Sequence, residues 1–199
     1  MGESLPCNME EKIRCGWSVS DPIYIEYHDQ EWGVPVRDER RQFEFLVLES
    51  AQAGLSWLTI LKRREGYRRL YEGFDPNLVV HFDEVRIKTM LLDAGIIRNL
   101  KKIESSINNA RRFLEVQEQY GSFCNYLWGF TDGKQVVNHF TDMSEIPATT
   151  ALSDTIAKDM KLKGFQFLGS TIIYAHLQAT GLVNDHLVDC FRYNECMEH

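Results

Sequence analysis

The sequence lacks the features that would assign it to a membrane, fibrous or disordered class. No apolar run approaches the roughly 20 residues that cross a bilayer, and neither an internal repeat nor a low-complexity tract is present. The stretch before Cys15 is polar and acidic and has no apolar core or small-residue cleavage site of the kind found in a secretory signal. We therefore expect a cytoplasmic protein without a membrane partner.

Cysteine and positive charge are also scarce. Five cysteines, an odd number, argue against a disulfide framework and favour a metal site or free thiols. The formal net charge of -7 argues against non-specific adhesion to nucleic acid, because phosphate contacts need Lys and Arg. Basic clusters can nevertheless gather on one face of a fold, or else lie on solvated helix surface. The clusters are Lys62-Arg63-Arg64 with Arg68-Arg69, Arg98 with Lys101-Lys102, and Lys161 with Lys163.

The composition that is present, 44% hydrophobic and 26% charged over 199 residues, is typical of soluble globular proteins. Helical patterns dominate after a loop-rich start, and the stretch 129–147 is predicted as a loop with short strands. An almost all-α fold follows, with a hairpin connection at 163–170. The predicted helices run from Asp38 to Gly54, Ser56 to Arg69, Asp83 to Asp93, Ile97 to Glu118, Ser153 to Leu162, Thr171 to Thr180 and Asp185 to Phe191.

Two cysteines and two histidines near the chain ends have the residue types of a zinc site. His186 and Cys190 are four residues apart, so the predicted helix would carry both on one face. Cys15 and His28 are separated by a predicted loop, and spacing alone does not show that the two pairs converge. A buried thiol beside a hydrogen-bonded histidine is the alternative. Four protein ligands would make the site structural, with no open position for a reactive water.

Aromatic side chains crowd the predicted N-terminal loop and recur after it, at Trp17, Tyr24, Tyr27, Trp32 and Trp57. Core packing is one explanation, because tryptophan and tyrosine are mostly buried. The other is a pocket that stacks a flat ligand such as a nucleobase, with hydroxyl groups free to bind the edge of the base.

Glu49 and the hairpin are the remaining candidates for a functional role. Glu49 lies in an apolar helical run, either at the edge of the buried face or in a pocket where a ligand offsets its desolvation. Such a carboxylate suits a cationic or hydrogen-bond-donating substrate. The hairpin from Lys163 to Ser170 permits tight turns, and the helix start after it exposes amides that can bind phosphate, although many such turns bind nothing.

Five sequence blocks in one order carry a resemblance that extends from Arg14 to Cys190. They are RCGW at 14–17, Tyr27-His28-Asp29 through EWGVP at 31–35, QAGLSW at 52–57, DAGIIR at 93–98 and GLVNDH at 181–186. In these blocks the chain resembles the DNA-3-methyladenine glycosylase I family of the helix-hairpin-helix superfamily. The resemblance implies a mainly α helix-hairpin-helix glycosylase fold. It implies a poorly matched extension at 1–13, a glycosylase domain at 14–192 with the base pocket between two helical subdomains, and a tail at 193–199.

The resemblance also assigns the sites. It implies one structural zinc ion that joins the two ends of the domain, and a base pocket in which Glu49 is the catalytic residue. A departure at Ser50-Ala51, where related enzymes can carry Gly-Gln, concerns fine selectivity rather than the activity class. The implied zinc ligands are Cys15, His28, His186 and Cys190, and the implied base-binding residues are Tyr27 and Trp57 with Tyr24, Trp17 and Trp32 nearby.

The implied activity is hydrolysis of the N-glycosidic bond of 3-methyladenine in alkylated double-stranded DNA, which releases the base and leaves an abasic site. Leu55, in the Gly54-Leu55-Ser56 turn, is the expected wedge in the vacated base stack. Bifunctional relatives carry a lysine just beyond the second hairpin glycine, whereas Ser170 and Thr171 stand here, so we expect no lyase activity. The expected backbone contacts to DNA come from Gly164, Gly169, Ser170 and Thr171.

Two other functions compete with this interpretation. A zinc-stabilised DNA-binding module would keep the hairpin and the metal but would not need both Glu49 and Trp57. A hydrolase that uses its metal directly would need an open ligand position, which four protein ligands do not leave. We expect a monomer, because one copy suffices for one flipped base.

Overall fold

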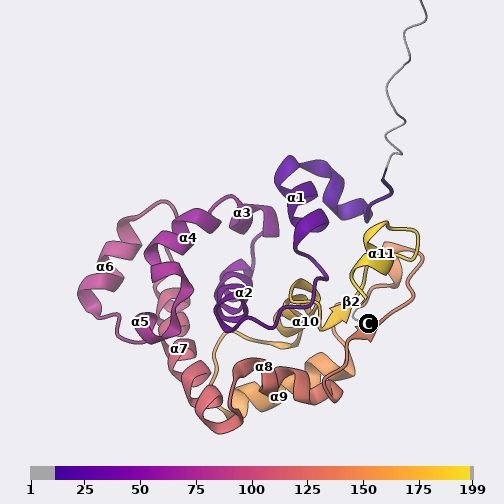
Figure 1. Cartoon of the computed structure of the whole chain (residues 1–199). Coiled ribbons are helices and arrows are strands. Elements are labelled where there is room, and N and C mark those ends of the chain that lie inside the picture. Colours follow the sequence, from indigo (N-terminus) through magenta and orange to yellow (C-terminus); the bar gives the residue numbers. More distant parts are fainter. Residues whose placement is uncertain (1–11, 198–199) are drawn as a thin grey trace, which may run out of the picture.

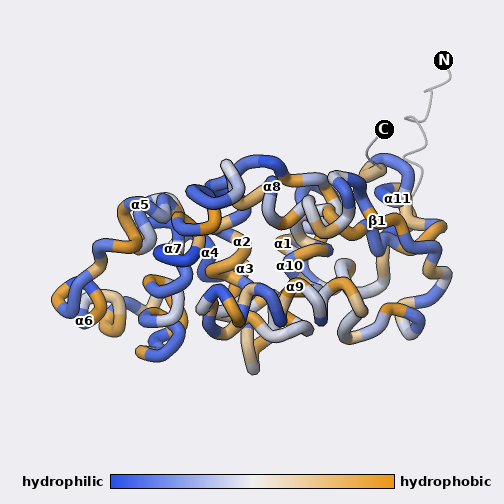
Figure 2. The backbone as a smooth tube through the Cα atoms, turned by 90° about the horizontal axis from the view of Figure 1, so that it is seen from below, coloured by the Kyte–Doolittle hydropathy of each residue, from blue (hydrophilic) through white to orange (hydrophobic). Residues whose placement is uncertain are grey.

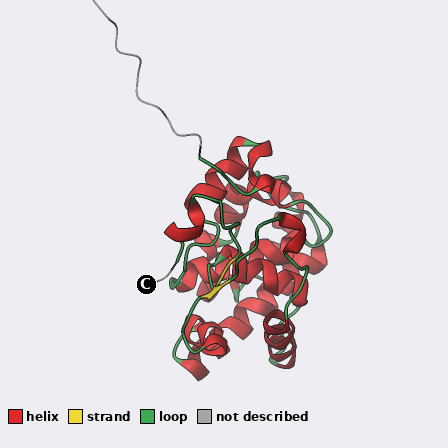
Figure 3. Cartoon of the chain, turned by 90° about the vertical axis from the view of Figure 1, so that its right-hand side faces the viewer, coloured by secondary structure: helices red, strands yellow, loops and turns green. Residues whose placement is uncertain are grey.

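The computed structural model describes residues 12–197, so Cys7 lies outside the described part of the chain. Within that part the fold is almost entirely helical, as Figure 3 shows, with one small pair of strands. The α-helices are α1 (Pro22–Gln30), α2 (Glu39–Gln52), α3 (Trp57–Leu61), α4 (Arg64–Leu70), α5 (Pro76–Val79), α6 (Glu84–Leu92), α7 (Leu100–Tyr120), α8 (Phe123–Trp128), α9 (Ala151–Leu162), α10 (Ser170–Ala179) and α11 (Arg192–Glu195). The 3₁₀ helices are η1 (Gly16–Ser20), η2 (Glu72–Phe74), η3 (Gly129–Thr131) and η4 (Met143–Glu145), and the strands are β1 (Val136–Val137) and β2 (Val183–Asn184).

Helices α2 and α10 occupy the centre of the molecule, with α5 and α6 at one end and β2 and α11 at the other (Figure 1). Helix α2 packs against α3, α7, α8 and α10, and its apolar residues Phe43, Phe45 and Leu48 are fully buried. Hydrophobic and hydrophilic segments alternate along the helices, as Figure 2 shows. This alternation is what helices with one buried side require.

Capping residues fix several helix ends where the sequence predicts them. Asp38 accepts a hydrogen bond from the Arg41 amide at the start of α2, and Asp83 caps α6 in the same way. Helix α7 ends at Gly121, whose φ of 80° is a left-handed conformation that glycine adopts at low cost. The predicted mainly helical fold is confirmed.

The interpretation of the N-terminal segment as a loop is wrong. Residues 22–30 form α1, whose first residue is Pro22 and whose N-cap Asp21 accepts a hydrogen bond from the Ile23 amide. Proline at the first position of a helix after an Asp cap is a known start signal. Helix α1 places Tyr24 and Tyr27 three residues apart and therefore on neighbouring positions of one face.

The predicted helix over 185–191 is also wrong. Instead β2 pairs in parallel with β1, and the chain continues in turns until α11 begins at Arg192. Polar side chains explain this conformation: Asn184 donates to the Tyr193 carbonyl oxygen at 2.9 Å and accepts from the His186 amide at 3.2 Å. Local side-chain bonds of this kind compete with helix formation.

Three other helix predictions differ from the structure at their boundaries. The helix predicted over 56–69 is split into α3 and α4. Arg64, at the start of α4, forms a buried ion pair with Glu44 and a partly buried one with Glu31. Tertiary contacts thus override the local pattern. Helix α7 begins three residues later than predicted, after its N-cap Asn99. Helix α9 begins at Ala151 with Thr150 as N-cap and Ser153 as its capping-box partner.

The basic clusters divide into paired and unpaired residues. Lys62 pairs with Asp21, and Arg69 pairs with Asp93, at 2.9 and 2.8 Å. Within residues 12–197, Arg98, Lys101 and Lys161 form no ion pair. No helix in the described part of the chain has the length and hydropathy that a bilayer crossing requires.

Candidate active site and metal cluster

A cavity of about 250 Å³ lies where α1, α2, α3 and α10 meet. Its volume is close to the lower limit of ligand pockets, which suits a small planar ligand. The cavity brings together all five aromatic residues that the sequence singled out, and Glu49 lies among them. The lining consists of Trp17, Tyr24, Tyr27, Trp32, Glu49, Gln52, Trp57, Met143, Ile146, Ala175 and Gln178.

The aromatic rings of the cavity support one another at their edges. The Trp17 ring contacts Trp32 and Tyr24 in edge-on arrangements, with centroids 5.1 and 5.5 Å apart. The Tyr27 and Trp57 rings lie with centroids 5.5 Å apart, and the Tyr24 hydroxyl accepts a hydrogen bond from the Leu58 amide at 3.0 Å. Rings fixed in this way are prepared to stack a flat ligand without losing side-chain entropy on binding.

Two polar groups of the cavity are buried without partners. Oε2 of Glu49 and Nε1 of Trp57 have no hydrogen bond within residues 12–197, and Glu49 is only 3% exposed. Burial raises the pKa of Glu49 to about 8. Burial, and the charge of Glu49 close by, also raise the pKa of Tyr27. Buried polar groups normally have partners, so the unpartnered oxygen of Glu49 indicates a ligand that donates a hydrogen bond to it.

A tight turn connects the two helices that carry Glu49 and Trp57. Gly54 has a φ of 79°, a Cβ at this position would meet no atom within 4 Å, and Leu55 is 41% exposed. Lys102 of α7 holds the turn, because its Nζ donates to the carbonyl oxygens of Ala51 and Ala53, at 2.7 Å each. The turn therefore presents an exposed apolar side chain on a fixed backbone.

Helices α9 and α10 pack against each other and are joined by a hairpin at 163–169. Gly164 has a φ of 86°, and Gly169 is the N-cap of α10. The α7 residue Asn109 fixes the hairpin by donating to the Gln166 carbonyl at 2.9 Å and accepting from the Gln166 amide at 2.8 Å. This clamp was not predicted from the sequence, although an Asn on the apolar side of an amphipathic helix was a signal for it.

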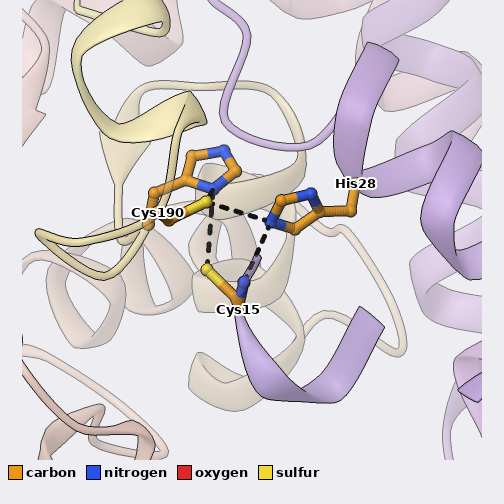
Figure 4. A group of neighbouring side chains, drawn as sticks. Cys15, His28 and Cys190 are labelled. Carbon is orange, nitrogen blue, oxygen red and sulfur yellow. Dashed lines mark hydrogen bonds between the residues drawn. The ribbon is translucent and has the colours of Figure 1, made fainter. Parts of the chain in front are cut away.

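The four predicted metal ligands lie together and are buried, and no two of their ligand atoms are more than 4.8 Å apart. Figure 4 shows Cys15, His28 and Cys190 converging. The Cys190 Sγ lies 3.4 Å from Nε2 of His28 and 3.5 Å from Nδ1 of His186, and Cys15 Sγ lies 3.7 Å from that Nδ1. Zinc bonds of about 2.3 Å to sulfur and 2.0–2.1 Å to nitrogen, at a tetrahedral angle, place S and N about 3.5 Å apart. The donor set thus fits a tetrahedral ion.

In each histidine, the ring nitrogen that faces away from the two thiols of the cluster lies beside a hydrogen-bond acceptor. His28 Nδ1 lies 2.9 Å from Asp29 Oδ1, and His186 Nε2 lies 2.9 Å from the carbonyl oxygen of Trp32. Burial opposes the charge of Asp29, but hydrogen bonds from Arg14 and His28 lower its pKa. Such acceptors direct the other ring nitrogen toward a metal.

The two thiols are coupled, and only that of Cys190 favours the thiolate form that a metal binds. Their mutual hydrogen bond raises the pKa of Cys15 and lowers the pKa of Cys190, which His186 and His28 lower further. The Leu187 amide donates to Cys15 Sγ at 3.5 Å. Because α1 carries His28 and the turns after β2 carry His186 and Cys190, the cluster connects both ends of the described chain.

Several residues around the two sites were not found from the sequence. Ala175 and Gln178 follow the hairpin on α10, three residues apart, and this spacing is the signal that could have found them. Met143 and Ile146 lie in or beside η4, in the stretch predicted as a loop, and have no such signal.

Comparisons with known proteins identify relatives of this chain. The family model for methyladenine glycosylase matches residues 17–193. The DNA-3-methyladenine glycosylase 1 of Escherichia coli strain K12 is 47% identical over 180 residues, which cover 90% of this chain and 96% of that protein. A crystal structure of 3-methyladenine DNA glycosylase I superposes with a TM-score of 0.86 at 46% identity, covering 90% of this chain and 98% of that one.

A further solved structure is a variant of 3-methyladenine DNA glycosylase I in complex with 3-methyladenine. It superposes with a TM-score of 0.88 at 35% identity, and the match covers 90% of this chain and 97% of that one. The fold and the matches place this chain in the class of DNA N-glycosylases. Within that class, it belongs to the methyladenine glycosylase family.

Proposed function

We propose that the protein hydrolyses the N-glycosidic bond of 3-methyladenine in alkylated double-stranded DNA, releasing the base and leaving an abasic site. The observation that carries the proposal is the unpartnered carboxylate of Glu49 in an aromatic cavity. The names of its relatives support the same substrate.

Glu49 gives the cavity a preference for a cationic base. Burial raises the pKa of Glu49 to about 8, so its carboxyl group is mostly protonated at neutral pH in the protein alone. A cationic base favours the ionised form, so Glu49 gives up its proton as the base binds, and the charge of the base offsets the desolvation of the carboxylate. Methylation at N3 makes the purine of a nucleotide positive, whereas unmodified adenine is neutral. The charged base is bound more strongly and is also the better leaving group.

The stacking and edge contacts follow from the lining. We assign Trp57 to stack on the base and Tyr27 and Glu49 to bind its edge, with Tyr24, Trp17 and Trp32 enclosing it. As the bond to the sugar breaks, an oxocarbenium-like sugar develops and water attacks it. The Glu49 carboxylate stabilises positive charge during this step, and it is the residue to which we assign catalysis.

The turn and the hairpin act on the DNA rather than on the base. Flipping a nucleotide costs a few kcal/mol, and the exposed Leu55 is placed to fill the vacated stack. The Gly164 amide does not take the part in backbone contacts expected from the sequence, because it donates to the Lys161 carbonyl oxygen at 3.0 Å and closes the turn. The amides of Gly169, Ser170 and Thr171 contact the DNA backbone, as a helix start can. These contacts explain how a chain of net charge -7 binds DNA, with modest and salt-dependent affinity. One copy of the chain serves one flipped base, so we propose a monomer acting alone.

We also propose that the enzyme is monofunctional. A lyase step requires an amine that forms a Schiff base with the sugar. The cavity lining holds no lysine among the described residues, and Ser170 begins α10 with its hydroxyl 2.8 Å from that of Ser153.

Cys15, His28, His186 and Cys190 would hold one zinc ion. With four protein ligands, the ion would supply structural stability and no reactive water. Two thiolates balance the charge of Zn²⁺, so the buried site would be neutral. Bound there, the ion would join the segment before α1 to the segment after β2.

The test is release of free bases from duplex DNA treated with a methylating agent, separated by chromatography. The proposal expects 3-methyladenine among the products, little 7-methylguanine and no unmodified adenine. A folded protein that binds this DNA and releases no base would favour the DNA-binding module instead. Unmodified duplex of the same sequence is the control.

A further inference from the structure

A buried polar cluster next to the cavity has no part in the mechanism described above. Asp185 is 0% exposed and its carboxylate accepts hydrogen bonds from three side chains. Asn138 Nδ2 donates to Oδ1 at 2.7 Å, Gln178 Nε2 donates to Oδ2 at 2.7 Å, and the Tyr174 hydroxyl also donates to Oδ2. Asp185 does not line the cavity, whereas Gln178 does.

The carboxylate of Asp185 determines how the Gln178 amide is oriented. An ionised carboxylate can only accept hydrogen bonds, and that of Asp185 already accepts from the Tyr174 hydroxyl and the Asn138 amide. Gln178 must therefore turn its NH₂ group, and not its amide oxygen, toward Asp185. The carbonyl oxygen Oε1 of Gln178 is then left over, and no described residue donates to it. Because Gln178 lines the cavity, this oxygen is the group of its side-chain amide that is left for a ligand there.

We propose that Gln178 is a base-selecting residue, with its amide oxygen accepting a hydrogen bond from the exocyclic amino group of the base, and that Asp185 is the positioning residue that holds it so. The inference rests on the proposed function. The amino group of 3-methyladenine carries two N–H donors, and Glu49 and Gln178 offer two acceptors in one cavity. A purine with a carbonyl oxygen in place of the amino group would put oxygen against oxygen, which disfavours it.

The first test compares 3-methyladenine with 3-methylhypoxanthine, in which a carbonyl replaces the amino group. Binding of each free base to the wild-type protein is followed by quenching of tryptophan fluorescence, since Trp17, Trp32 and Trp57 line the cavity. We expect 3-methyladenine to bind at least tenfold more tightly. Equal affinity for the two bases would overturn the proposal without any variant.

The second test uses Gln178→Met, which keeps the length of the side chain and removes the acceptor. The lost hydrogen bond should raise the Kd for 3-methyladenine about threefold to tenfold and leave the Kd for 3-methylhypoxanthine unchanged or lower. A variant that weakens both bases equally has lost packing only, which would contradict a role in selection.

The positioning role of Asp185 is tested with Asp185→Asn and with the double variant. Asp185→Asn should lower the ratio of the Kd for 3-methylhypoxanthine to the Kd for 3-methyladenine. Adding Gln178→Met to Asp185→Asn should lower this ratio no further, because both changes act through the amide of Gln178. Tyr174→Phe is the matched control: it removes another hydrogen bond to the same carboxylate but leaves Gln178 oriented. Full discrimination in Asp185→Asn would refute its role.

The outcomes separate the inference from the function on which it rests. A wild-type protein that neither binds 3-methyladenine nor releases it from DNA would refute the proposed function and the inference together. A wild-type protein that does both, with Gln178→Met equal to it, would refute the inference alone. Zinc content is measured in each variant, because Asp185 precedes His186 in the chain.

Discussion

The stability advantage of Glu49→Gln over the wild type should grow as the pH rises. In the folded state burial raises the pKa of Glu49 to about 8, against an ordinary value of 4.5. The unfolded chain therefore loses its proton near pH 4.5, while the folded chain keeps it until about pH 8. Between these values the folded state binds more protons, so wild-type stability decreases as the pH increases. The neutral amide does not titrate and escapes this loss.

The size of the effect follows from the raised pKa. Each pH unit in the window costs the wild type about 1.4 kcal/mol, so the interval from pH 4.5 to 7 costs about 3 kcal/mol in unfolding free energy. For a chain of this length about 1 kcal/mol corresponds to 2–4 °C in Tm. The variant should therefore gain about 6–12 °C over the wild type between acid and neutral pH.

The assay is thermal and urea unfolding of both proteins at pH 5, 6, 7 and 8. The stability difference between Glu49→Gln and the wild type should grow with pH and level off above pH 8. Glu26→Gln, which removes an exposed carboxylate from α1, is the control for the loss of one negative charge. A difference between Glu49→Gln and the wild type that stays constant from pH 5 to 8 would refute the reasoning.

Three further predictions concern the wedge, the metal and the lyase step. Leu55→Ala should lower excision from duplex DNA at least tenfold while binding of free 3-methyladenine is unchanged, and an equal loss in both assays would contradict a wedge. Purified protein should contain one zinc ion per chain. Cys190→Ala should lower the zinc content and reduce the unfolding free energy by at least about 3 kcal/mol, as loss of a structural metal does. A wild-type protein that is stable without zinc would argue against the site. Borohydride should trap no covalent complex between protein and DNA, since a Schiff base needs an amine in the cavity.

The parts of the fold that the sequence predicts are those determined by local chemistry. Asp38 and Asp83 cap helices where expected, and Gly121 ends α7, because each acts on its own backbone neighbours. The boundaries that differ depend on distant partners. Arg64 forms ion pairs with Glu31 and Glu44, each more than 19 residues away along the chain, and the helix predicted over 56–69 is interrupted just before Arg64.

The residues of the candidate sites could be predicted only where residue type marks them. Glu49 is conspicuous as a charge in an apolar run, and the aromatic cluster is conspicuous by its density. The zinc set depends on a turn after β2 that hydrogen bonds of Asn184 hold, and no spacing rule gives that turn. In the sequence, Gln178 cannot be distinguished from other polar helix residues, because its role depends on the hydrogen bond that it donates to Asp185.

The central claim is that Glu49 in the aromatic cavity selects and helps to release a methylated base. The most direct test measures release of 3-methyladenine from methylated duplex DNA by the wild type and by Glu49→Gln in parallel, with binding to the same DNA measured alongside. We expect release by the wild type and a loss of at least hundredfold in the variant, with DNA binding reduced by less than threefold. Equal release by the two proteins would contradict the claim.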